Sequence, residues 1–105
     1  MNDRGQPQET APKSEVLALT GALSFETVPK VLEESATYAS RADLPDRLTI
    51  DFAGITGVDS ASVALLLEWR RQAAARGKQL AFVNLPPNLL ALAGLYGVAD
   101  LIEKA

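Results

Sequence analysis

The stretch that decides the fold runs from Leu48 to Gly77 and reads LTIDFAGITGVDSASVALLLEWRRQAAARG. Apolar and polar residues alternate over residues 48–52, as they do in a half-buried strand. The glycines within residues 53–57 predict a loop after this strand. From Ser60 onward the apolar residues follow helical spacing, and Gly77 is typical of the left-handed residue that follows a helix. We therefore expect a strand, a loop and a helix in succession.

Asp59 and Ser60 stand where the loop meets this helix. Either side-chain oxygen can accept a hydrogen bond from the free backbone N–H groups of the first turn, and the helix dipole favours a negative charge there. Helix capping is therefore the purely structural interpretation of the pair. Ser60 can also be a contact residue, because its small side chain lets a partner approach the helix start. The two roles are compatible.

The predicted helix carries apolar side chains on more than one side. At about 100° per residue they form two stripes, one of Val63, Leu66, Leu67 and Ala74 and the other of Ala61, Leu65, Trp69 and Ala73. One stripe is enough to pack a helix on a sheet, so the second indicates a deeply buried helix or a docking surface. We predict that part of the second stripe, with Trp69 at its rim, contacts another protein. The alternative is that the chain's own loops cover it.

The rest of the chain extends this pattern on both sides. Residues 1–13 are almost free of apolar side chains and predict a disordered tail, which leaves residues 14–105 as the domain. The further elements expected there are a strand at 16–20, a helix at 25–40, a loop at 41–47, a strand at 80–83, a helix from Pro86 or Pro87 to Gly97, and a short strand or packing segment at 98–102. A strand, a helix and a strand in that order indicate a parallel βαβ unit. The predicted fold class is α/β, a single domain with a small mixed sheet of about four strands and helices packed on it.

The composition excludes several classes of function. The chain of 105 residues has no Cys, no His and a formal net charge of −3, which removes thiolate chemistry, thiolate metal sites and the commonest general base. We therefore expect no cofactor, no metal and no enzymatic activity. The negative charge favours neither nucleic acid nor an anionic membrane surface as partner. No apolar run reaches the roughly 20 residues that cross a bilayer, and no signal peptide is recognised, so we expect a cytoplasmic protein without direct membrane insertion.

Two motifs, in their proper order, carry a resemblance to a known family. The first is the segment from Leu48 to Ser60 with its Ala/Leu-rich helix, and the second is Leu89-Leu90-Ala91-Leu92-Ala93-Gly94-Leu95-Tyr96-Gly97-Val98. Together they resemble the STAS domain, the fold of sulfate-transporter tails and anti-sigma-factor antagonists. The resemblance covers nearly everything after the predicted tail.

Within that family, the residues that follow Asp59 most resemble the MlaB subfamily. The antagonists usually read Asp-Ser-Ser or Asp-Ser-Thr followed by Gly, whereas here Ser60 is followed by Ala61 and then by a Leu/Ala helix. We expect no phosphorylation for this reason; Ser60 or Ser62 would carry it only if the protein were an antagonist. The residues expected to contact a partner are Asp59, Ser60, Ala61, Ala64, Leu65 and Trp69.

This resemblance implies a non-catalytic accessory subunit of a phospholipid-transporting ABC complex that maintains outer-membrane lipid asymmetry. The expected partner is the MlaF-like ATPase subunit of that transporter, which the domain would bind and stabilise at the inner face of the inner membrane. Apolar patches that a partner normally covers can also give a weak homodimer of the isolated domain. The alternative function is that of an anti-sigma factor antagonist, which switches partners on phosphorylation.

Overall fold

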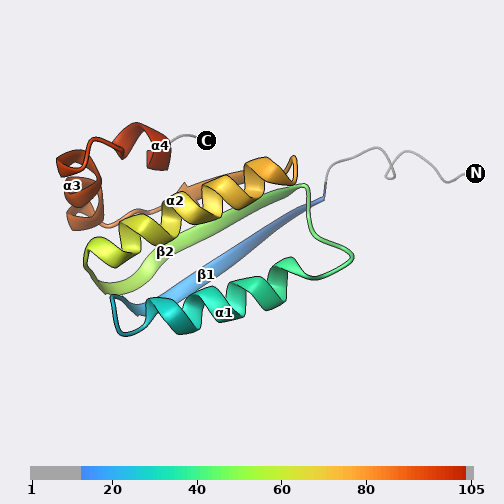
Figure 1. Ribbon diagram of the computed structural model, residues 1–105, viewed down its shortest axis with the longest axis horizontal. Coiled ribbons are helices and arrows are strands. Elements are labelled where there is room, and N and C mark those ends of the chain that lie inside the picture. The colour runs from blue at the N-terminus through green and yellow to red at the C-terminus, as the bar shows by residue number, and fades with distance from the viewer. Residues whose placement is uncertain (1–12, 104–105) are drawn as a thin grey trace, which may run out of the picture.

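The computed structural model describes residues 13–103, which form three strands and four helices (Figure 1). Strands and helices alternate up to the third strand, and the last two helices follow it. The elements are β1 Ser14–Leu23, α1 Val28–Ala39, β2 Arg47–Val58, α2 Ser60–Ala75, β3 Gln79–Val83, α3 Pro87–Leu95 and α4 Ala99–Glu103. Residues 1–12 of the tail predicted for residues 1–13 lie outside the described residues. Lys13, which the sequence assigned to the tail, already joins the domain, because its carbonyl oxygen accepts a hydrogen bond from the backbone N–H of Arg47 at 3.0 Å.

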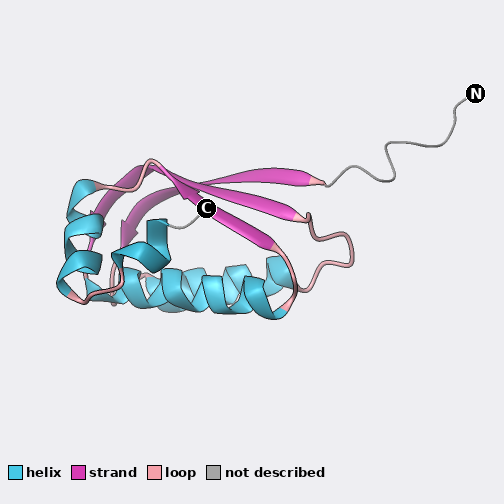
Figure 2. Ribbon diagram, turned by 90° about the horizontal axis from the view of Figure 1, so that it is seen from above, coloured by secondary structure: helices cyan, strands magenta, loops and turns pink. Residues whose placement is uncertain are grey.

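The sheet confirms the α/β class but is simpler than expected. Within residues 13–103 it has three strands in the order β1-β2-β3, and both neighbouring pairs are parallel, so it is not the mixed sheet of about four strands that the sequence predicted. Helices α1 and α2 lie together on one face of it, as the view from above shows (Figure 2). The opposite face is open and carries exposed residues of β1 such as Val16, Ala18 and Thr20.

Strand β2 is longer than predicted, since residues 53–57 continue it instead of forming a loop. This second half pairs with the end of β1 across two register shifts, so that Thr20 lies opposite Gly54 and Leu23 opposite Val58. A Cβ on Gly54 would lie 2.8 Å from the carbonyl oxygen of Leu19, closer than side chains come. The glycine therefore permits a close approach of two bulged strands. The prediction of a loop at residues 53–57, which was based on the glycines there, is therefore wrong.

Helix α1 begins three residues later than expected, at Val28. Residues 24–27 instead form a turn, in which the Thr27 hydroxyl accepts a hydrogen bond from the backbone N–H of Ser24 at 2.9 Å and donates one to the carbonyl oxygen of Ala22 at 2.7 Å. Pro29 then stands in the first helical turn, where a missing N–H costs no hydrogen bond. The turn leaves Phe25 in a loop at the carboxyl end of β1, with 70% of its surface exposed.

The core lies between the sheet and the helices and extends to the end of the described chain. Phe52 of β2, Leu66 of α2, Leu89 of α3 and Ile102 of α4 are each exposed by 1% or less. Residues 98–102, expected as a strand or packing segment, thus pack through a short helix. Arg70 of α2 links β3 to α4. Its guanidinium donates hydrogen bonds to the carbonyl oxygens of Leu80 and Ile102 and lies 4.6 Å from the centre of the Phe82 ring. No helix within residues 13–103 is long and apolar enough to cross a membrane.

Candidate partner-binding site at the start of helix α2

The carboxylate of Asp59 organises the start of α2. One oxygen, Oδ1, caps the helix by accepting a hydrogen bond from the backbone N–H of Ala61 at 2.9 Å. The other, Oδ2, accepts one from the backbone N–H of Phe25 at 3.0 Å. Capping was therefore predicted correctly for Asp59, and the same side chain also joins the helix start to the loop between β1 and α1. Residues 34 positions apart in the sequence are held side by side.

Ser60 is the first residue of the helix and not its cap. Its side chain is half-buried, and its hydroxyl has no hydrogen-bond partner within the part of the chain that the structure describes. One turn later on the same side of the helix, Ala64 is exposed. We call the area formed by Phe25, Asp59, Ser60 and Ala64 the α2-start surface. It combines a large apolar side chain, a small one, a hydroxyl group and a partly covered carboxylate.

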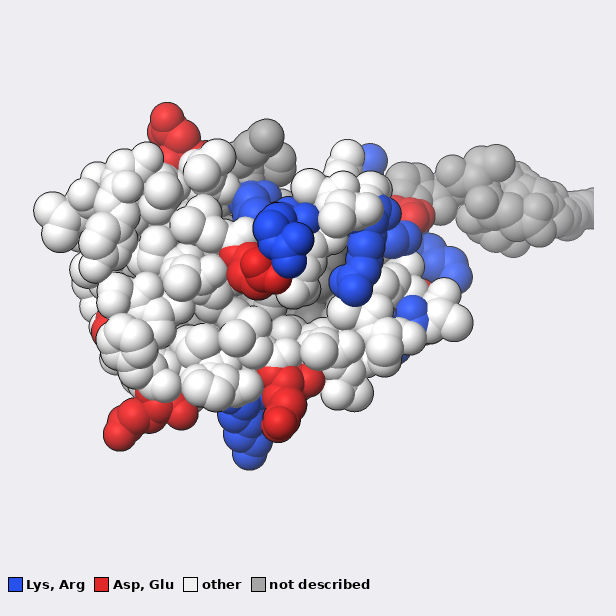
Figure 3. Space-filling view, in the orientation of Figure 1, with Lys and Arg blue, Asp and Glu red and all other residues white. Residues whose placement is uncertain are grey.

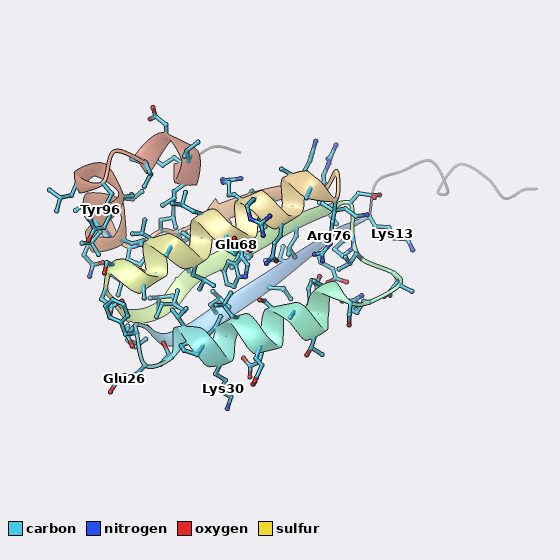
Figure 4. The ribbon with its side chains drawn as sticks, viewed as in Figure 1. Lys13, Glu26, Lys30, Glu68, Arg76 and Tyr96 are labelled. Atoms are coloured by element: carbon cyan, nitrogen blue, oxygen red, sulfur yellow. The ribbon has the colours of Figure 1, made fainter. Side chains whose placement is uncertain are left out.

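Further apolar side chains are exposed at the same end of the molecule. Leu95 is 80% exposed and Tyr96 is 53% exposed, both at the end of α3. Figure 4 shows Tyr96 and Glu26, the neighbour of Phe25, on opposite sides of the start of α2. In the space-filling view the centre of this end carries no charged side chains, acidic side chains lie at its edges, and the basic side chains lie over the middle and the other end of the molecule (Figure 3). The α2-start surface thus belongs to an apolar end.

Two residues of the predicted contact set lie elsewhere. Leu65 is 2% exposed and Trp69 is 8% exposed, and both belong to the hydrophobic core. Trp69 lies between the sheet and α1, where it borders a cavity together with Val31 of α1. The prediction that Leu65 and Trp69 form an outward-facing stripe is therefore wrong. The chain itself covers this stripe, as the alternative held, but it does so with helix α1 and not with loops. Ala61 is half-buried and packs against the core.

Ser62 is not available at the surface either. It is fully buried, and its hydroxyl donates a 2.6 Å hydrogen bond to the carbonyl oxygen of Asp59. A phosphate group on this side chain would have to be accommodated inside the first turn of the helix, in contact with the core. Of the two hydroxyl residues considered for modification, only Ser60 is reachable in the folded domain.

The charged residues of α2 form their own pairs farther along the helix. Glu68 accepts hydrogen bonds from Arg71 and from Gln72, and these contacts lower the pKa of its carboxyl to about 2. Figure 4 shows Glu68 midway along the helix, away from the α2-start surface. Among residues 13–103, no three His, Cys, Asp or Glu side chains gather as they would around a metal ion. The arrangement at the helix start is suited to contact with another molecule more than to chemistry on one.

The residue of the α2-start surface that sequence reasoning missed is Phe25. It was assigned to the first turn of a helix expected at residues 25–40. The signal that could have found it is Pro29, because a helix tolerates proline best in its first turn and so begins close to that residue. A later helix start leaves Phe25 in the preceding loop.

Comparisons with known proteins agree with the fold and the residue pattern. A family model described as the MlaB STAS domain matches residues 8–103. The solved structure of the anti-sigma factor antagonist SpoIIAA in its unphosphorylated form is similar at a TM-score of 0.67 and 19% sequence identity, over 87% of this chain and 78% of that one. A sulfate transporter family protein from Wolinella succinogenes is similar at a TM-score of 0.69 and 12% identity, over 98% of this chain and 84% of that one. No curated protein matches the sequence significantly. The two structures share this fold, and the family match over most of the sequence confirms the predicted resemblance: the chain belongs to the STAS-domain family.

Proposed function

We propose that this domain is a non-catalytic accessory subunit that binds and stabilises the ATPase subunit of a phospholipid-transporting ABC complex. The observation that carries the proposal is the match of residues 8–103 to the family model described as the MlaB STAS domain. The α2-start surface supplies the physical means of binding. In this role the domain reaches the inner face of the inner membrane only through its partner.

The chemistry of the α2-start surface supports a constitutive protein contact. Phe25 offers a large apolar side chain that loses little conformational freedom on binding, and aromatic residues of this kind are frequent anchors in interfaces. Ala64 and Ser60 beside it are small, so a partner helix or loop can come close to the backbone of α2. The Asp59 carboxylate is already engaged by two backbone N–H groups, so it brings less unpaired charge into the interface than an exposed acid would.

Co-purification with the ATPase tests this proposal. The domain is co-expressed with an MlaF-like ABC ATPase from its own organism, and the complex is isolated through a tag on the ATPase. We expect a stable stoichiometric complex with the parent chain and none with Ser60→Arg, whose long charged side chain would separate the two surfaces. Ala75→Arg is the matched control, since it places the same side chain at an exposed position at the other end of α2. Loss of the complex in both variants, or in neither, would contradict the proposed surface.

The second candidate function, an anti-sigma factor antagonist, is favoured by one observation. The Ser60 hydroxyl lies at a helix start, without a hydrogen-bond partner in the described residues, and a helix N-terminus stabilises a phosphate group. A kinase could therefore modify this residue without unfolding the domain. Mass spectrometry of the protein isolated from its own cells decides between the two functions. Phosphoserine at position 60, with a complex that forms only after its removal, would establish the antagonist and exclude the accessory subunit.

A further inference from the structure

A cavity of about 220 Å³ lies between α1, α2 and the covered face of the sheet. Its walls are mostly apolar, with Leu17, Leu19, Val31, Leu48, Ile50 and Trp69 among the residues that line it. An apolar cavity of about 150 Å³ is enough to hold a benzene molecule in an otherwise well-packed protein. The space here is larger than that and is not part of the α2-start surface, which lies at the other end of the two helices.

The polar groups around this cavity are unequally distributed. Arg76 lies at the rim, at the carboxyl end of α2 (Figure 4), and no carboxylate within residues 13–103 forms an ion pair with it. Lys78 lies at the same rim and pairs with Asp46 at 3.3 Å. Glu34, on the α1 side, is the acidic residue among those that line the cavity. The space-filling view shows a hollow next to the basic side chains of this end (Figure 3).

The Trp69 indole forms part of the apolar wall of this cavity. Its N–H is buried against other protein atoms and has no hydrogen-bond acceptor within the described residues, so it is not a donor that the cavity presents to a ligand. The cavity therefore offers apolar walls and, at its rim, a guanidinium without a carboxylate partner. A molecule that suits both has an apolar chain and an anionic end that accepts hydrogen bonds.

We infer that this cavity binds a single-chain carboxylate amphiphile, a medium-chain fatty acid, with its chain among the apolar residues and its carboxylate on Arg76. The volume of the cavity limits the size of the ligand, because about 220 Å³ holds one short alkyl chain and is below the roughly 300–1,000 Å³ of common ligand pockets. A lipid with two long chains does not fit. The site is separate from the contact with the ATPase, so either proposal can fail without the other.

Trp69 is the only Trp of the chain, so its fluorescence reports directly on the cavity. The full chain is titrated with octanoate, decanoate and dodecanoate, each below its micelle concentration. We expect a saturable change, with an affinity that rises by about fourfold per added methylene, the factor that corresponds to burying one such group, and that stops rising once the chain fills the cavity. The absence of a saturable change with any of the three acids would overturn the proposal.

Variants at the rim test the position of the carboxylate. Arg76→Ala should weaken decanoate binding by about tenfold through the loss of a charge-assisted hydrogen bond, while decanol binding should not change. Arg71→Ala is the matched control, because Arg71 is on the same helix, pairs with Glu68 and does not line the cavity. Equal weakening by both variants, or binding of decyltrimethylammonium as tight as that of decanoate, would show that no anion site exists at Arg76.

Discussion

Two parts of α2 lie in opposite surroundings: the outward side of its start, and the buried side of the turns that follow. At the start, Ser60 and Ala64 face outward beside the exposed Phe25. In the following turns, Leu65, Leu66 and Trp69 are enclosed by the sheet and α1. The difference shows that an apolar helix face becomes a docking surface only where no other element of the chain reaches it. Here the short turn before α1 leaves the helix start uncovered, and α1 itself covers the rest.

The largest effect is expected from the buried region. Trp69→Ala should lower the free energy of unfolding by about 3–5 kcal/mol, because it removes a large core side chain and enlarges an existing cavity. Denaturation by urea, followed by circular dichroism, measures the change. Full stability combined with loss of the complex would mean that Trp69 faces a partner after all.

A change at the boundary between the two regions should have an intermediate effect. Asp59→Ala removes the helix cap and the bond to the Phe25 N–H, with an expected loss of about 1–2 kcal/mol in the free energy of unfolding. Asp59→Asn keeps an oxygen for the cap but offers an NH₂ group in place of the second acceptor. It should therefore be more stable than the Ala variant. Equal losses from the two variants would show that the cap adds nothing, and an Asn variant as stable as the parent would show that the bond to the Phe25 loop adds nothing.

The exposed region should affect binding without affecting folding. Phe25→Ala should change the free energy of unfolding by no more than about 0.5 kcal/mol and weaken the complex with the ATPase by about tenfold or more, as the loss of an interface anchor does. Titration calorimetry gives the affinity. Val16→Ala is a control with a similarly exposed apolar side chain, 68% against 70%, on the open face of the sheet. The same weakening in both variants would remove the distinction between the two surfaces.

The smallest effect concerns Glu68, on the outer side of the buried turns. Hydrogen bonds from Arg71 and Gln72 lower its pKa from 4.5 to about 2, so the folded state favours the ionised carboxylate. This contribution to stability is complete above the unfolded pKa and is lost as the pH falls toward 2. An NMR titration of the side chain should have its midpoint near pH 2. A midpoint close to 4.5 would mean that the Glu68–Arg71 pair does not persist in solution.

The sequence predicted secondary structure correctly where the residues of a single element determine its conformation. Leu48–Phe52 alternates and is a strand, residues after Asp59 follow helical spacing and form a helix, and Gly77 follows the helix end with a positive φ of 67°. Each of these depends on local backbone preferences and on a single buried face. The same holds for the cap at Asp59.

The errors arose where a second element decides the outcome. Nothing in residues 60–75 indicates that α1 covers Leu65 and Trp69, because that depends on which side of α2 the other helix packs. Gly54 is likewise typical of a loop in the sequence, and only the structure shows that it lies against the backbone of Leu19 in the neighbouring strand. Of the predicted contact residues, Asp59, Ser60 and Ala61 are half-buried and Ala64 is exposed. Ser60 and Ala64 stay accessible because they lie on the side of α2 that faces away from the core.

The open face of the sheet has a consequence for how the molecule behaves at high concentration. Strand β1 presents mainly short side chains there, Ala18, Thr20 and Ala22 among them, and Val16 is the largest exposed apolar one on that strand. Two sheets that stack face to face need long side chains to fill the roughly 10 Å between them. Copies of this domain stacked through their open faces would leave that gap poorly filled. The open face of the sheet therefore does not favour self-association. Dimers that form at high concentration should involve the apolar end of the molecule instead.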